Sequence, residues 1–237
     1  MGKPLPAIRA LTFDLDDTLW PVMPVIEHAE QTLQAWLTVH CPRVIERWDI
    51  EAIRSLRAEV AECQPEIAHD FSAQRVATLR HVLTDCGYSM ALVDRAFAVF
   101  FDARHQVELF PDVHPTLSRL AKSFPLAAIT NGNADPERIG LSMFSFCLHA
   151  RNFNPKPHAA LFDAARKRLA VDAEHVVHIG DHPEQDVMAA RNAGFQAIWV
   201  NRHNELWVGD GEPPLSVRSL AEIPALLCKL CARPSLA

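Results

Sequence analysis

Short apolar runs alternate with amphipathic stretches through the second half of the chain, which is typical of neither an all-α nor an all-β protein. Runs typical of buried strands occupy residues 126–130, 144–149, 176–180 and 197–200. Helices are expected before and between them, over residues 113–120, 157–169 and 184–193, the last closed by Gly194. Strands that alternate with helices form a parallel sheet with helices on both faces. We therefore predict a doubly wound, Rossmann-like α/β core.

A further strand is expected near the start of the chain, far from the others. Apart from Arg9, residues 7–13 are apolar or β-branched, and this run ends at Asp14. Between residues 22 and 104 the apolar residues recur at helical spacing, with breaks near Pro42, Pro65 and Gly87, so about four helices and no strand are expected. The prediction is an α/β core formed by residues 1–21 and 108–237, with an inserted all-helical cap domain over residues 22–107.

Composition excludes several classes of protein. The 237 residues are 49% hydrophobic and 22% charged, which suits a large buried core. The formal net charge is −6 with no basic block, so nucleic acid is not an expected partner. No apolar run approaches the roughly 18 residues of a membrane span, and residues 1–4 lack the apolar stretch of a signal peptide. We expect a soluble cytoplasmic protein that does not bind membranes.

Polar side chains follow the predicted strands. Carboxylates come directly after the first strand and after the strand at 176–180, a hydroxyl and an amide end the strand at 126–130, and a lysine precedes the helix at 157. The set is Asp14, Asp16, Thr130, Asn131, Lys156, Asp181 and Asp186. In open α/β sheets, ligands bind outside the carboxyl ends of the strands. We therefore expect these groups to meet at one edge of the sheet.

This set of groups indicates a magnesium and phosphate site. Clustered carboxylates repel one another unless a cation is present, and Mg²⁺ takes carboxylates, waters and phosphate oxygens as ligands. Lys156, the Thr130 hydroxyl and the N–H groups of the Asn131 turn can bind phosphate. Each residue alone has an ordinary explanation: a helix cap for Asp14 or Asp181, a turn for Thr130, a solvated side chain for Lys156. Their combination and order favour the site.

The pattern resembles the haloacid dehalogenase superfamily of phosphohydrolases over the whole chain. The DLDDT string that begins at Asp14 is similar to the first motif, DxDxT. Thr130 corresponds to the second motif and Lys156 to the third. Asp181 and Asp186, in Gly-Asp-x-x-x-x-Asp, correspond to the fourth. The helical insert is similar to the first type of cap in that superfamily.

The resemblance implies a phosphatase mechanism for the carboxylates. Asp14 would be the nucleophile that forms an aspartyl-phosphate. Asp16 would protonate the leaving alcohol and later deprotonate the hydrolytic water. Mg²⁺ would be held by the carboxylates of Asp14 and Asp181 and by the backbone carbonyl of Asp16. Dehalogenases that resemble this chain lack an acid at position 16, because a leaving halide needs no proton.

The resemblance also assigns the remaining groups. Thr130, the N–H of Asn131 and Lys156 would hold phosphate oxygens. Asp186 would hold Lys156 or a metal-bound water. His182 stands where many members have a small residue, and we interpret it as a residue at the mouth of the site that touches substrate.

The strings LTFDLDDTLW, AITNGN and PEIAHDFSAQR are similar to a bacterial branch that dephosphorylates FMN and 5-amino-6-(5-phospho-D-ribitylamino)uracil. A flavin or uracil ring needs an aromatic or apolar platform and a few polar anchors. Trp20, Phe71 and Arg75 are candidates, with helix packing for Phe71 and a surface charge for Arg75 as alternatives. A cap implies a small phosphorylated metabolite as substrate, and the protein would be a monomer or a homodimer.

Other functions remain open at this point. A sugar- or nucleotide-phosphate phosphatase, or a phosphotransferase of the same superfamily, would carry the same motifs. A non-catalytic binding module would be expected to lose one of the acidic residues or the lysine, and all of them are present.

Overall fold

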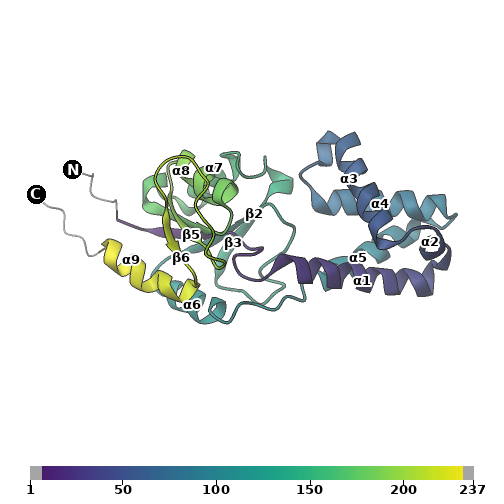
Figure 1. Ribbon diagram of the computed structural model, residues 1–237, viewed down its shortest axis with the longest axis horizontal. Helices are drawn as coiled ribbons and strands as arrows, with labels where there is room; N and C mark the ends of the chain where they lie inside the picture. The colour runs from purple at the N-terminus through teal and green to yellow at the C-terminus, as the bar shows by residue number, and fades with distance from the viewer. Residues whose placement is uncertain (1–6, 232–237) are drawn as a thin grey trace, which may run out of the picture. The chain divides into compact units, whose positions relative to one another are not determined.

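The computed structural model describes residues 7–231 (Figure 1). The chain divides into two compact units. The first, here called the sheet unit, comprises Met1–Trp20, Leu109–Gly132 and Pro136–Ala237. The second, the helical unit, comprises Pro21–Glu108 and Asn133–Asp135. Residues 1–4, on which the expectation about a signal peptide depends, lie outside the described residues.

The sheet unit contains six parallel strands in the order β3-β2-β1-β4-β5-β6, which confirms the predicted fold class. The strands are β1 (Ala10–Phe13), β2 (Leu126–Thr130), β3 (Phe144–His149), β4 (Val176–Gly180), β5 (Gln196–Val200) and β6 (Leu215–Val217). The chain winds outward from β1 to β3, then returns to the other side of β1 and winds outward from β4 to β6. Ligands bind at such a reversal of strand order, outside the carboxyl ends of the strands.

The central strands are level with one another where they end. Phe13, the last residue of β1, pairs with Ala128 of β2 and with Ile179 of β4. The N–H of Asp14 then donates to the carbonyl of Ile179 at 2.9 Å. All residues of β1, β2 and β4 are buried, which explains their continuous apolar sequences. The register therefore brings the residues that follow these strands to one edge.

Helices cover both faces of the sheet. They are α6 (Val113–Leu120), α7 (Ala160–Leu169), α8 (Ala189–Asn192) and α9 (Ile223–Cys231). Figure 1 shows α7 and α8 on one face and α6 and α9 on the other. Short 3₁₀ helices lie at Ala150–Asn152, Ala173–His175 and Leu220–Glu222. The strand β6 has no counterpart in the sequence-based prediction.

The helix expected at 184–193 differs from the prediction. Pro183–Met188 form a π-helix, and only Ala189–Asn192 continue as the α-helix α8. The carbonyl of His182 accepts hydrogen bonds from the N–H groups of both Asp186 (3.0 Å) and Val187 (3.3 Å), which widens this turn. Gly194, with φ +83°, follows the end of α8 as expected. Single π-turns often occur at functional sites, and this one carries Asp186.

The helical unit is formed by α1 (Val22–His40), α2 (Pro42–Arg47), α3 (Ile50–Cys63), α4 (Phe71–Asp85) and α5 (Val93–Ala103), with 3₁₀ helices at Pro65–Ile67 and Met90–Leu92. It has its own apolar core, to which Leu37, Leu83 and Phe100 contribute. Asn133–Asp135 belong to this unit, and Asn133 donates to the Ser72 hydroxyl at 3.1 Å. Among the described residues, no helix is long and apolar enough to cross a membrane.

Candidate active site

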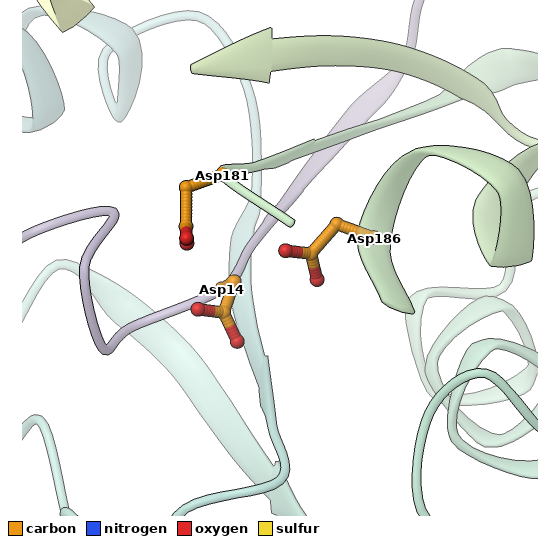
Figure 2. A group of neighbouring side chains, drawn as sticks. All are labelled: Asp14, Asp181 and Asp186. Atoms are coloured by element: carbon orange, nitrogen blue, oxygen red, sulfur yellow. The ribbon is translucent and has the colours of Figure 1, made fainter. Parts of the chain in front are cut away.

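Three carboxylates meet at the carboxyl edge of the sheet. Asp14 follows β1, Asp181 follows β4, and Asp186 lies in the π-helix. One oxygen of each lies within 4.8 Å of the others. Figure 2 shows the three side chains directed toward a common space between them. The convergence of these residues, expected from the order of the strands, is therefore present in the structure.

Lys156 is the cation beside this cluster. Its Nζ lies 2.5 Å from Asp14 Oδ1 and 2.5 Å from Asp186 Oδ1, and all three side chains are buried. Burial alone would lower the pKa of Lys156, but attraction to Asp14 and Asp186 outweighs it and raises the pKa above its ordinary value. The ammonium group therefore stays charged between two carboxylates.

The remaining carboxylate charge fits a bound cation. Burial raises the pKa of Asp14 well above its usual range, Lys156 opposes this, and Asp186 and Asp181 raise it further. Burial, and then the charge of Asp186, raise the pKa of Asp181 to about 7. One ammonium group thus leaves the cluster short of positive charge. An all-oxygen donor set of this kind suits Mg²⁺, with Asp14 and Asp181 as ligands.

Asp186 is held by groups of the protein itself. Its Oδ1 accepts from Lys156 and lies 3.2 Å from His178 Nε2, and its Oδ2 accepts from the N–H of His182 at 2.9 Å. Burial would raise the pKa of Asp186, but Lys156 and His178 outweigh this and lower it below its usual range. Burial lowers the pKa of His178, whose Nδ1 lies 2.9 Å from the Thr12 hydroxyl. Asp186 therefore supports Lys156 as a fixed anion.

Gly180 is required by the close approach of Asp186. A Cβ at position 180 would lie 2.3 Å from Cγ and 2.5 Å from Oδ2 of Asp186. Such distances are well below van der Waals contact. The last residue of β4 must therefore have no side chain if Asp186 is to reach Lys156.

Asn131 positions Lys156 through the backbone. Its Oδ1 accepts from the N–H of Lys156 at 2.8 Å, and its Nδ2 donates to the carbonyl of Lys156 at 2.9 Å and to Gln185 Oε1 at 3.0 Å. This attachment, with a turn closed by His158 N–H on Pro155 O (2.9 Å), explains why α7 begins at Ala160 and not at residue 157 as predicted. The Thr130 hydroxyl accepts from the N–H of Gly132 at 2.9 Å.

The loop after β1 carries Asp16. The indole N–H of Trp20 donates to Asp16 Oδ1 at 2.9 Å. The hydroxyl of Thr18 donates to Asp181 Oδ1 at 2.7 Å, so this loop is tied to the end of β4. Asp17 has φ +60°, a left-handed conformation that turns the chain sharply between Asp16 and Thr18.

Of the four side chains expected to contact substrate, three have other partners and one is exposed. Trp20 has no exposed surface and binds Asp16, and His182 Nδ1 accepts from the N–H groups of Glu184 and Gln185 at 3.2 Å as a helix cap. In the helical unit, Phe71 is 45% exposed at the start of α4. The expectation of a surface charge at Arg75 is wrong: its side chain is buried and pairs with Glu30 at 3.2 Å.

Several supporting residues were missed by the sequence-based reasoning. His178 binds Asp186, and Gln185 binds Asn131. Thr18 was included in the first motif without a role, and its hydroxyl binds Asp181. The indole N–H of Trp199 donates to the carbonyl of Asp181 at 2.6 Å. His178 could have been found, because it is the one charged or strongly polar residue in the apolar run of β4. Gln185 and Trp199 carry no comparable signal.

The sheet and its edge define a class of protein: a doubly wound α/β protein that gathers three carboxylates and one buried ammonium group at a single edge of its sheet. The model of the haloacid dehalogenase-like hydrolase family matches residues 8–194. The chain belongs to that family, which confirms the resemblance of its motifs.

Named relatives include both phosphatases and a dehalogenase. The 5-amino-6-(5-phospho-D-ribitylamino)uracil phosphatase YigB of Escherichia coli is 34% identical, covering 95% of this chain and 98% of its own. A glyceraldehyde 3-phosphate phosphatase of Methanopyrus kandleri is 28% identical over 82% of this chain and 84% of its own. The crystal structure of a 2-haloacid dehalogenase from Pseudomonas syringae has a TM-score of 0.88 and 41% identity, covering 94% of this chain and 99% of that one.

Proposed function

We propose that this protein is a Mg²⁺-dependent phosphatase that hydrolyses small phosphate monoesters through an aspartyl-phosphate on Asp14. The observation that carries the proposal is the buried contact of Lys156 with both Asp14 and Asp186, beside the further carboxylate Asp181. A phosphoryl group placed against Asp14 would meet the Lys156 ammonium group at once. Electrostatic stabilisation by fixed charges is commonly the largest part of enzymatic rate enhancement.

The chemistry proceeds in two displacements. In the first, a carboxylate oxygen of Asp14 forms a bond to phosphorus while the bond to the leaving oxygen breaks, and Asp16 gives its proton to that oxygen. In the second, Asp16 takes a proton from water as the water oxygen bonds to phosphorus, and the Asp14–phosphorus bond breaks. The products are an alcohol and inorganic phosphate, and both aspartates return to their starting states.

The other groups bind and orient the phosphoryl group. Lys156, the Thr130 hydroxyl and the N–H of Asn131 hold its oxygens, and Asp186 keeps Lys156 in place. Asp14 and Asp181 would hold Mg²⁺, together with the backbone carbonyl of Asp16, and the bound cation would neutralise charge on the phosphoryl oxygens. Because Asn131 binds the Lys156 backbone at both its N–H and its carbonyl, the ammonium group is positioned before substrate arrives.

The substrate that we propose is 5-amino-6-(5-phospho-D-ribitylamino)uracil or FMN, both of which carry a phosphate on a ribityl chain attached to a ring. The support is the 34% identity with YigB, which extends over nearly the full length of both chains. Sugar phosphates and nucleotides are the alternative substrates within the same reaction class.

The test measures inorganic phosphate released from FMN, the ribitylaminouracil phosphate, sugar phosphates and nucleoside monophosphates. We expect the two ring–ribityl phosphates to have the highest kcat/KM, and equal values across the panel would contradict this substrate assignment. Asp14→Asn and Asp16→Asn should each lose at least about two decades of rate, given the usual contribution of acid–base catalysis. Turnover in excess EDTA, or in the Asp14→Asn variant, would refute the mechanism.

A second candidate is hydrolysis of 2-haloacids, favoured by the 41% identity with the solved 2-haloacid dehalogenase. The acid at position 16 argues against it, since a leaving halide needs no proton. Incubation with 2-chloropropionate decides between the two: chloride release by the wild type, undiminished in EDTA and in Asp16→Asn, would favour the dehalogenase. We expect no chloride release.

A further inference from the structure

The hydrogen bond from Trp20 to Asp16 is not explained by the catalytic roles above. The indole Nε1 lies 2.9 Å from Asp16 Oδ1, and the Trp20 ring is fully buried while Asp16 is partly exposed. A buried aromatic ring can hold only a few orientations. The indole N–H of Trp20 therefore fixes the orientation of the Asp16 carboxyl group, although Asp16 is only partly buried.

The backbone fixes the same two residues relative to one another. The N–H of Asp17 donates to the carbonyl of Trp20 at 2.8 Å, and the N–H of Leu19 donates to the carbonyl of Leu15 at 2.8 Å. Asp16 and Trp20 also form an isolated bridge. The loop thus closes on itself, so that the indole reaches back to a carboxylate four residues earlier.

This closed loop is anchored to the rest of the sheet unit. Arg202 donates to the carbonyl of Thr18 at 3.0 Å, and the N–H of Phe110 donates to the carbonyl of Leu19 at 3.0 Å. Thr18 also binds Asp181 through its hydroxyl. The loop that carries Trp20 is therefore fixed by hydrogen bonds to the rest of the sheet unit, including one to Asp181, a proposed Mg²⁺ ligand.

We propose that Trp20 is a positioning residue for the general acid and base Asp16. Its indole N–H holds the Asp16 carboxyl group in the direction from which it delivers a proton to the leaving oxygen and later takes one from water. This role rests on the proposed phosphatase function. A general acid contributes only when its proton is within reach of the atom that receives it. Loss of the indole N–H should therefore weaken proton transfer without removing the acid.

The leaving group of the substrate distinguishes positioning from simple packing. p-Nitrophenolate leaves without much help from an acid, whereas the more basic phenolate needs the proton more. Trp20→Phe removes the N–H and keeps an aromatic ring. We expect kcat/KM to fall about tenfold for phenyl phosphate and less than about threefold for p-nitrophenyl phosphate. Packing damage alone would lower both values by the same factor and would overturn the proposal.

A double-variant cycle gives a second readout. Asp16→Asn should show the same selective loss on phenyl phosphate, and larger. Because Trp20 acts through Asp16, adding Trp20→Phe to Asp16→Asn should change kcat/KM by less than about twofold, whereas independent effects would multiply. Multiplied losses would overturn the proposal.

Trp48→Phe is the matched control. Trp48 donates its indole N–H to Asp85 at 3.1 Å within the helical unit, so this variant removes the same kind of hydrogen bond elsewhere. The ratio of the two kcat/KM values should stay at its wild-type value. If it falls as in Trp20→Phe, the effect is not specific to Asp16 and the proposal is overturned.

A variant that does not fold and a wild-type protein without activity each have their own consequence for the proposal. If Trp20→Phe does not fold, β-(3-benzothienyl)alanine at position 20 keeps the size of the ring and replaces only the N–H by sulfur, and the same selective loss is expected. If wild-type protein with Mg²⁺ releases phosphate from neither ester, the phosphatase function and this role both fall. Wild-type activity with an unchanged ratio in the position-20 variants overturns the role of Trp20 alone.

Discussion

Replacing Gly180 by alanine should disable the site through a single methyl group. The added Cβ would lie 2.3 Å from Cγ, 2.5 Å from Oδ2 and 2.6 Å from Cβ of Asp186. Ordinary carbon contacts begin near about 3.5 Å, so Asp186 must retreat by about 1.2 Å. Its hydrogen bonds to Lys156 (2.5 Å), His178 (3.2 Å) and the N–H of His182 (2.9 Å) leave no direction in which it can move without losing one.

The expected cost follows from these contacts. Overpacking costs about 1–3 kcal/mol, and one lost hydrogen bond to a charged group adds about 1.5–3 kcal/mol. A total of about 2.5–6 kcal/mol would lower the Tm of a chain of this length by roughly 5–24 °C. Because Asp186 positions Lys156, we also expect kcat/KM to fall about a hundredfold, as displacements of this size do elsewhere.

The assay is phosphate release from p-nitrophenyl phosphate with Mg²⁺, beside a thermal melt of the same preparation. Gly140→Ala is the control, since a Cβ there meets nothing within 4 Å and only the φ of +85° is strained. That strain costs about 1–2 kcal/mol and should leave kcat/KM unchanged. A folded Gly180→Ala variant with kcat/KM within about twofold of wild type would refute the steric reasoning.

Two further results are expected. Asn131→Ala removes both side-chain contacts to the Lys156 backbone. It should lower kcat/KM by about tenfold to a hundredfold and the free energy of unfolding by about 1–3 kcal/mol. The control Asn154→Ala, at an exposed residue near Lys156, should change neither quantity, and equal effects of the two variants would contradict the role assigned to Asn131. Asp181 has its pKa raised from 3.8 to about 7, so this carboxyl group binds more proton in the folded state than in the unfolded state in this range, and its contribution to the stability of the metal-free protein should be lost as pH rises from about 4 to 7. Urea unfolding in EDTA measures this slope; Asp181→Asn should flatten it, and Mg²⁺ should stabilise more at pH 8 than at pH 5.

The edge of the sheet could be predicted because simple patterns mark the strands and the polar residues that follow them. The apolar runs that became β1, β2 and β4 each end at a polar residue, and parallel strands place those ends together. Asp14, Lys156 and Asp181 therefore met as expected, although 142 residues separate Asp14 from the lysine that binds it.

The supporting contacts could not be predicted in the same way. The π-turn depends on one carbonyl, that of His182, accepting two N–H groups, and no periodicity in the sequence marks such a choice. Asn131 was expected to offer its backbone N–H to phosphate, whereas its side chain is occupied by the Lys156 backbone. Arginine is a residue type that usually lies at the surface, and Arg75 is buried where Glu30 faces it from another helix. Such pairings arise from tertiary geometry.

The central place of β1 has a consequence for synthesis on the ribosome. Its neighbours in the sheet are β2 and β4, and Leu11 pairs with Leu126 on one side and with Val177 on the other. Both partners are translated long after Leu11. The apolar core of the helical unit extends from Ala29 to Ala103 and is translated in between. Domains generally fold as they emerge, from the N-terminus onward. In the nascent chain, Asp14 therefore follows an apolar strand that has no neighbours yet, while the helices of the helical unit form behind it. The proposed active site is assembled only when β4 joins the sheet.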